Sequence, residues 1–253
     1  MNFDPKRRFS DRVENYVKYR PHYPEALLSF MKDECGLTQS SVIADVGSGT
    51  GISSELFLNN GNKVYAVEPN DEMRSAAESI FSDDKNFISV NASAEETGLE
   101  NNSVDLIIAG QAFHWFELGK SKSEFKRILK NEGNFFIIWW NSRIFKEGFM
   151  DEYEDLLVKF GNDYEKVNHE NIDDAVIRGF FSPNEFSVRK FYIFQEFDLE
   201  GLKGRLLSSS YVPNSGDPAS AEMLKALEKL FDRYNINGKV KMEYDTVVYF
   251  GRL

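Results

Sequence analysis

Cysteine is almost absent from this sequence, and its scarcity excludes several kinds of site. Cys35 is the only cysteine among 253 residues. A single thiol cannot form an internal disulfide, a multi-cysteine zinc site or an iron–sulfur cluster held by several thiolates. The composition of 42% hydrophobic and 14% aromatic residues is nevertheless sufficient to bury a core, and nothing indicates disorder.

Long apolar runs and an excess of positive charge are also missing. No stretch approaches the roughly 18 apolar residues of a membrane span, and residues 1–16 contain no apolar signal core. The net charge of −11 argues against a general nucleic-acid binder, although a small basic patch is compatible with it. We therefore expect a cytoplasmic protein without membrane or nucleic-acid partners, present as a monomer or a homodimer.

Strand-like and helix-like segments alternate through the first part of the chain. We expect strands at 41–47, 63–69, 86–92, 103–109 and 133–140. Helices are expected at 52–60, at 70–81 with Asn70 or Asp71 as N-cap, and before Gly133 with a capping box of Ser121 and Glu124. Alternation of near-continuous apolar strands with helices predicts a parallel sheet that is covered on both faces.

This alternation ends after Asn141. Residues 142–180 are predicted to be mostly helical, and residues 189–199 and 241–253 have the pattern of strands. Residues 217–234 predict an amphipathic helix with Asp217 as N-cap and Pro218 at its first position.

The segment DVGSGTG, Asp45 to Gly51, is the strongest chemical signal in the chain. It places glycines at 47, 49 and 51 between a strand and a helix, where they allow a tight turn and the close approach of a ligand. A dinucleotide-binding loop would need glycine in place of Ile52, and a Walker loop would need a Gly-Lys-Ser/Thr end. Neither is present. The G-x-G-x-G form of this loop resembles the loop of class I S-adenosylmethionine-dependent methyltransferases.

The resemblance covers about residues 35–140 and implies the fold of that family. The fold is α/β: a Rossmann-like sheet of seven mostly parallel strands, with the last strand antiparallel and helices on both faces. The resemblance also implies S-adenosylmethionine as the cofactor.

Glu68 closes the second expected strand, 21 residues after Gly47. A carboxylate there can accept hydrogen bonds from both ribose hydroxyls; the alternative is a solvated charge at a strand end. The loop at 91–97 resembles the one that borders the adenine, and many relatives have Asp where this chain has Ser93. The expected cofactor-binding residues are Tyr16, Arg20, Asp45, Gly47, Ser48, Gly49, Gly51, Glu68, Pro69, Ser93, Ala94, Glu95 and Gln111. Among them, Asp45 either braces the glycine loop and the methionine amine or has a purely structural role.

The segment GQAFHWF, Gly110 to Phe116, follows the fourth strand, where the family places its reacting methyl group. The residues AGQA replace the Asn/Asp-Pro-Pro-Tyr/Phe of methyltransferases that act on nucleobase amines. Cys35 lacks the Pro-Cys context of cytosine C5 methylation, and the acidic ligand of metal-dependent catechol methyltransferases is absent. These absences leave O-, N- or C-methylation of a small molecule and predict no metal.

His114 is the candidate catalytic residue, and three roles are open for it. It can act as a general base, position the acceptor or only orient the loop. A carboxylate acceptor is already ionised and needs no base, so alignment can supply much of the rate. Phe113 and Trp115 are expected to form an aromatic wall, to which at most one of Trp139 and Trp140 can contribute because neighbouring strand residues point opposite ways.

Two short motifs, RPHYP at 20–24 and GQAFHWF, resemble the trans-aconitate methyltransferase-like branch of the family. Phe9, Val13, Tyr16 and Arg20 recur at helical spacing, and the resemblance implies that their segment closes over the cofactor as a lid. Arg20 would bind a carboxylate of the methionine or of the acceptor; alternatively, it forms a surface ion pair on a packed helix.

These patterns together predict one methyltransferase domain over residues 1–253. It would contain a lid at 1–30, a cofactor-binding core at 35–140 and acceptor-side insertions at 142–240. The expected acceptor is a small carboxylate, or else a phenolic or aromatic metabolite; an RNA or protein acceptor fits the acidity less well. The rival classes are a non-catalytic S-adenosylmethionine-binding protein and a dinucleotide-dependent oxidoreductase, which Ile52 disfavours.

Overall fold

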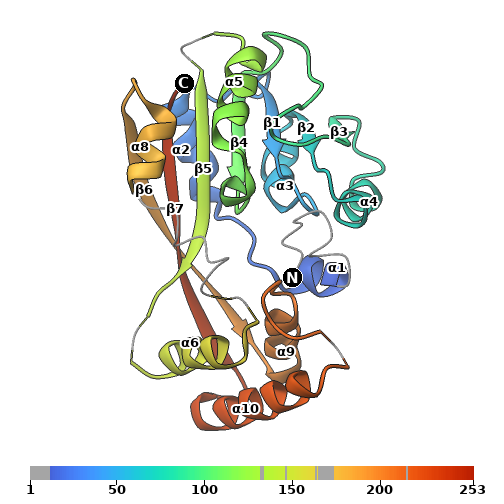
Figure 1. The fold of residues 1–253 in the computed structure, drawn as a ribbon, viewed down its shortest axis with the longest axis vertical. Coiled ribbons are helices and arrows are strands. Elements are labelled where there is room, and N and C mark those ends of the chain that lie inside the picture. The colour runs from blue at the N-terminus through green and yellow to red at the C-terminus, as the bar shows by residue number, and fades with distance from the viewer. Residues whose placement is uncertain (1–11, 132–133, 146, 163, 165–173, 215) are drawn as a thin grey trace.

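The computed structural model describes residues 12–131, 134–145, 147–162, 164, 174–214 and 216–253. These residues form a seven-stranded sheet in the order β3-β2-β1-β4-β5-β7-β6 (Figure 1). The strands are β1 (Val42–Val46), β2 (Lys63–Val67), β3 (Phe87–Val90), β4 (Leu106–Gly110), β5 (Phe135–Arg143), β6 (Phe186–Phe197) and β7 (Val240–Arg252). Strands β1 to β5 pair in parallel, whereas β7 runs antiparallel to both β5 and β6. The predicted fold class is confirmed.

Helices connect the strands and cover both faces of the sheet. They are α1 (Val13–Tyr19), α2 (Glu25–Cys35), α3 (Ile52–Asn59), α4 (Asp71–Ile80), α5 (Leu118–Ile128), α6 (Phe149–Phe160), α8 (Asp174–Phe181), α9 (Leu199–Leu207) and α10 (Pro218–Tyr234). Side chains alternate across each strand, so one face of β4 packs in a core with Phe125 of α5 and Phe180 of α8. The other face packs with Met31 of α2 and Phe57 of α3. The apolar strands are therefore buried on both sides, as parallel strands usually are.

A second core lies beyond the end of the parallel strands. There, α6, α9 and α10 pack together on the far ends of β6 and β7; we call these helices the helical layer (Figure 1). The buried side chains of this second core include Tyr153, Leu206 and Leu227 of the helical layer and Tyr244 of β7. Strand β5 reaches toward this layer, because Trp140 to Arg143 pair only with β7 and extend past the end of β4. The molecule thus has two packed regions that face each other across the carboxyl ends of the parallel strands.

The helix caps test the local predictions. Asn70 accepts a hydrogen bond from the Met73 amide, and Asp217 accepts one from Ala219, so both predicted N-caps are confirmed. The capping box of Ser121 and Glu124 is wrong: both lie inside α5, whose N-cap is Glu117. The helix also ends at Ile128, before Gly133.

Glu124 is not a capping residue because its carboxylate is used elsewhere. It accepts hydrogen bonds from the Thr97 amide (2.8 Å) and from Nη2 of Arg127 (2.7 Å). These bonds tie α5 to the loop after β3 and hold the pKa of Glu124 at about 2, chiefly through Arg127.

Candidate active site

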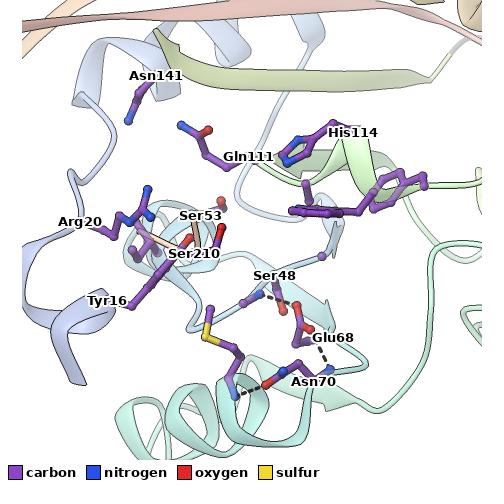
Figure 2. Close-up of a pocket in the computed structure, with 18 of the residues that line it drawn as sticks. Tyr16, Arg20, Ser48, Ser53, Glu68, Asn70, Gln111, His114, Asn141 and Ser210 are labelled. Carbon is purple, nitrogen blue, oxygen red and sulfur yellow. Dashed lines mark hydrogen bonds between the residues drawn. The ribbon is translucent and has the colours of Figure 1, made fainter. Parts of the chain in front are cut away.

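A cavity lies at the carboxyl ends of the parallel strands, on the side that faces the helical layer. Each of the first five strands leads to a residue in its wall: Gly47, Glu68, Ser93, Gln111 and Asn141. Ligands of open α/β sheets bind at this edge, because the loops there converge. Figure 2 shows several of these side chains around the cavity.

The structure brings together most of the residues that the sequence selected. Those that line the cavity are Tyr16, Arg20, Gly47, Ser48, Gly49, Glu68, Pro69, Ser93, Ala94, Glu95, Gln111 and His114. Asp45 and Gly51 do not line it. Phe9, which was expected to share the face of Tyr16, lies outside the described residues.

The glycine loop brings the backbone close to the cavity. Gly47 has a φ of +71°, and a Cβ there would lie 2.4 Å from that of Ala112, so no other residue fits. The Gly49 amide donates to Oε2 of Glu68 (2.9 Å), and the Asn70 amide donates to Oε1 (2.8 Å). Each carboxylate oxygen retains a lone pair for a further donor, such as a ribose hydroxyl. Burial raises the pKa of Glu68, although the backbone bonds oppose this shift.

Asp45 is fully buried beneath the glycine loop instead of facing the cavity. Its Oδ2 accepts a hydrogen bond from Oγ of Ser54 on α3 (2.7 Å), while its Oδ1 has no hydrogen-bond partner within the described ranges. Burial raises the pKa of Asp45 to about 7, and the charge of Glu68 adds to the shift. In this arrangement Asp45 connects β1 to α3.

The loop after β3 and the start of α5 are joined by Glu95. Its Oε1 accepts a hydrogen bond from the Glu117 amide (2.8 Å). Burial alone would raise the pKa of Glu95, but this bond and one with Ser93 outweigh it and lower the pKa. The same part of the cavity is lined by Met73 and Phe116, which the sequence did not single out as ligand contacts.

The aromatic wall differs from the one expected. Trp115 lines the cavity, but Phe113 is fully buried in the core, where its ring centre lies 4.8 Å from that of Phe180. Trp139 and Trp140 belong to the cores on opposite faces of the sheet, and neither lines the cavity. The expected wall reduces to Trp115, because a short 3₁₀ helix (Phe113–Trp115) turns Phe113 away from the cavity.

His114 and Gln111 face the cavity from the end of β4 (Figure 2). Gln111 has a φ of +58°, a conformation that non-glycine residues rarely adopt and that occurs often at functional sites. Its amide donates to the Trp139 carbonyl (2.8 Å), which fixes the turn. Burial lowers the pKa of His114 to about 4, so its imidazole is neutral at pH 7.

Helix α1 lies beside α9, and two predicted ligand residues line the cavity from this segment: Tyr16 within α1 and Arg20 directly after it. The guanidinium of Arg20 lies 4.8 Å from the ring centre of Tyr16, and its Nη2 donates to the Ser208 carbonyl (2.9 Å). Arg20 forms no ion pair with any described residue, so the expected alternative of a surface ion pair does not apply. Burial and the nearby Arg205 lower its pKa.

The far end of the cavity is lined by residues that the sequence did not select. They are Asn141, Arg143, Tyr164, Arg205, Ser210 and Tyr211. Asn141 and Arg143 could have been found by extending the alternation of the fifth strand by three more residues, to position 143. The others come from distant segments, and no local pattern marks them.

The pKa of Tyr211 reflects the positive charge at this end of the cavity. Its burial alone would raise the pKa of the phenol. Arg143, Arg20 and Arg205 outweigh that effect and lower the pKa to about 8. The far end of the cavity is therefore strongly electropositive.

The described part of the chain contains neither a candidate metal site nor a candidate membrane helix. No group of three or more His, Cys, Asp and Glu side chains there is arranged to bind a metal. None of the described helices is long and apolar enough to cross a membrane.

Part of the chain is similar to known methyltransferases. Residues 44–137 match the family described as methyltransferase domain. An uncharacterized methyltransferase of Schizosaccharomyces pombe is 31% identical over 134 residues, which cover 53% of this chain and 52% of that protein. An uncharacterized methyltransferase of Mycobacterium tuberculosis is 27% identical over 154 residues, which cover 61% and 60%. The chain thus spans between about half and three fifths of the length of these relatives.

The fold has a counterpart among solved structures. A candidate type II methyltransferase from Anaeromyxobacter dehalogenans superposes with a TM-score of 0.70 at 23% identity, covering 92% of this chain and 98% of that one. At this identity the likeness shows the fold alone. The architecture is therefore the Rossmann-like fold of class I methyltransferases. Within it, the segment that contains the glycine loop and Glu68 matches the methyltransferase domain family, and that similarity implies S-adenosylmethionine as the methyl donor.

Proposed function

We propose that this protein transfers the methyl group of S-adenosylmethionine to a small carboxylic acid and forms a methyl ester. One observation supports this function above all others: a single cavity joins the glycine loop and Glu68 at one end to an electropositive end lined by Arg20 and Arg205. The first end suits a nucleoside, and the second suits an acid.

The residues of the first end fit the cofactor. A Cβ on Gly47 would collide with Ala112, the Oγ of Ser48 is buried without a partner among the described residues, and Glu68 retains acceptor capacity. Glu68 would hold the ribose, and the loop from Ser93 to Glu95 would border the adenine. Asp45 and Gly51 would support the loop from behind.

The second end fits an acceptor that needs no base. S-adenosylmethionine supplies a methyl group bound to a positively charged sulfur, so a carboxylate becomes an ester without releasing a proton. His114 is neutral at pH 7 and would then position the acceptor. A phenolic acceptor is the second candidate; it would have to lose a proton, and neutral His114 is the nearest candidate in the predicted set to receive it.

The branch resemblance in RPHYP and GQAFHWF also favours a carboxylate. A cytoplasmic location, a monomer or homodimer, and a single domain with a lid at 1–30 stay predictions. A non-catalytic protein that binds S-adenosylmethionine is the remaining rival.

The test is incubation with S-adenosylmethionine labelled in its methyl group and a metabolite extract. We expect the label in a small molecule, released as methanol by mild alkali because esters hydrolyse there. Label that resists alkali would favour a phenolic ether, and tight binding without any labelled product would favour the non-catalytic rival.

Cofactor binding is tested separately with Glu68→Ala. Loss of two charge-assisted hydrogen bonds should weaken binding by about two to three orders of magnitude in calorimetry. Because the same carboxylate also accepts from Gly49 and Asn70, the thermal unfolding of the variant must be measured alongside. A folded variant with unchanged affinity would remove Glu68 from the cofactor site.

A further inference from the structure

The far end of the cavity contains more positive than negative charge. Arg20, Arg143 and Arg205 all line it. Arg143 forms an ion pair with Glu154 (Nη2 to Oε2, 2.9 Å) and also bonds to the hydroxyl of Tyr164. Neither Arg20 nor Arg205 has a carboxylate partner among the described residues. One buried guanidinium group, that of Arg205, and one half-buried group, that of Arg20, are thus left without a counter-charge, which is costly unless an anion binds.

Arg205 is the clearer example of a guanidinium group with unused hydrogen-bond donors. Only 4% of it is exposed, and its closest donor contacts are long, at 3.5 Å to Oγ of Ser208 and 3.4 Å to Oγ of Ser209. Its Nε is buried and has no hydrogen-bond partner in the described part of the chain; the same holds for Nε of Arg20. The side chain therefore retains unused donors in a place that water reaches poorly.

Asn141 adds a donor of fixed direction. Its Oδ1 accepts a hydrogen bond from Oγ1 of Thr246 (2.6 Å), so the amide nitrogen is the group that can donate to a ligand. That Nδ2 is buried and has no partner among the residues that the structure describes, and only 7% of Asn141 is exposed. Figure 2 shows Asn141, Gln111 and Arg20 around the same open part of the cavity. The unused polar groups of Asn141, Arg20 and Arg205 are all donors.

We propose that Arg205 and Asn141, together with Arg20, form an anion subsite that anchors the acceptor through an acidic group other than the one that is methylated. The proposal rests on the function proposed above. A carboxylate held by guanidinium groups has its negative charge stabilised, which makes its oxygens weaker nucleophiles. The acceptor is then a small acid with a second nucleophilic group, and its methylated product keeps an anionic group.

Binding is tested with succinate as the anionic probe and succinamide as its neutral counterpart, at about pH 7, where Tyr211 is protonated. The protein is first saturated with S-adenosylhomocysteine, so that the methionine carboxylate of the cofactor has its own place. We expect calorimetry to show succinate binding at least about tenfold more tightly than succinamide. Equal binding of the two probes, or no succinate binding, overturns the subsite.

Two variants locate the effect. Arg205→Gln should weaken succinate at least about tenfold and leave the affinity for S-adenosylhomocysteine unchanged. If it weakens S-adenosylhomocysteine instead, Arg205 belongs to the cofactor site and the proposal is wrong. Arg189→Gln, on the exposed face of β6, is the matched control and should change neither affinity.

Asn141→Asp keeps the test decisive if Arg205→Gln fails to fold. Aspartate retains an acceptor for Thr246 and places a carboxylate among the arginines, so the variant should fold and lose succinate binding. A folded Asn141→Asp protein with full succinate affinity contradicts the proposal.

The labelled product gives an independent outcome. If the extract experiment yields a labelled molecule, we expect it to be retained on an anion-exchange resin at neutral pH; a neutral product overturns the anchoring role. Failure of the proposed function has a different sign: the unaltered protein would not bind S-adenosylhomocysteine. In that case the succinate measurement on the ligand-free protein still tests the anion subsite.

Discussion

Burial determines the exposure and the pKa of single residues in this site more than their place in a sequence motif does. The sequence predicts both Asp45 and Glu68 as cofactor-binding residues, yet Asp45 is fully buried and only Glu68 lines the cavity. The same burial lowers the pKa of His114 to about 4 and raises that of Asp45 to about 7. Burial disfavours the charged form of each group, so the two shifts have opposite signs.

Asp45 gives a prediction on stability. The folded pKa of about 7 lies above the ordinary value of 3.8, so between these values the folded protein binds a proton that the unfolded chain has released. The contribution of Asp45 to stability is therefore present at low pH and is lost as pH rises toward about 7. We expect Asp45→Asn, which does not titrate, to gain stability over the native protein between about pH 4 and 7, with a constant difference above that.

Urea unfolding across this pH range measures the effect, with the exposed Asp83→Asn as control. The control should show no such trend. If the difference between Asp45→Asn and the native protein does not change with pH, Asp45 is ionised when folded and the role in bracing the methionine amine regains support.

His114 gives a prediction on protonation. We expect its imidazole to stay neutral from about pH 8 down to about pH 5.5, because its lowered pKa lies below that range. Nitrogen chemical shifts of the ring measure this, and the signal is assigned by its loss in His114→Asn. A signal that titrates near the ordinary value of about 6.5 would show that the imidazole is solvated.

Activity separates the roles of His114. If it is a base, His114→Asn lowers kcat strongly and removes the acidic limb of the profile near pH 4. If His114 positions the acceptor, His114→Asn raises KM and the acidic limb persists. In that case the limb reflects protonation of the acceptor's own carboxyl group, which the substitution does not change.

At the scale of elements, the parallel half of the sheet could be predicted and the acceptor end could not. Apolar runs and a glycine loop are local patterns, and they placed β1 to β5 and Glu68 correctly in the chain. The capping box failed because Glu124 is used by Thr97, a contact made only by folding. Arg205 and Arg20 line the same cavity although 185 positions separate them in the sequence, and no local pattern predicts such a long-range pair.

The link between α1 and α9 is a second feature that the sequence does not reveal. Arg12 is buried and donates to the carbonyls of Leu207 (3.0 Å), Ser209 (2.8 Å) and Val212 (2.6 Å). These carbonyls lie at the end of α9 and in the turn beyond it. Arg12 therefore fixes the segment that brings Tyr211 into the cavity wall.

We expect Arg12→Met to destabilise the protein by about 2–4 kcal/mol, because several buried carbonyls lose a charged donor. It should also weaken succinate more than S-adenosylhomocysteine, since the turn after α9 lines the far end of the cavity. Urea unfolding and calorimetry measure the two effects. Arg189→Met on exposed β6 is the control, and equal stability of the two variants would show that the Arg12 contacts contribute little.

At the scale of the whole molecule, the cavity is bounded by two separately packed regions. The sheet and its covering helices supply the glycine loop, Glu68 and Gln111, while α9 and the turn after it supply Arg205 and Tyr211. Strand β5 links the regions, since its extension holds Asn141. A cofactor and an acceptor would therefore stabilise different regions of the same chain.

Amide hydrogen exchange can resolve this division. We expect S-adenosylhomocysteine alone to slow exchange in the loops at 47–51, 68–70 and 93–95, because amides there lie in or beside the cofactor end. Adding succinate should extend the protection to residues 205–212 and to Asn141, whose partners lie in the helical layer and on β7. If S-adenosylhomocysteine alone protects both sets equally, the cavity responds as one unit and the division between a nucleoside end and an acid end is wrong. If succinate protects the glycine loop instead, the acid occupies the cofactor end, and the donors of Arg205 and Asn141 serve another ligand.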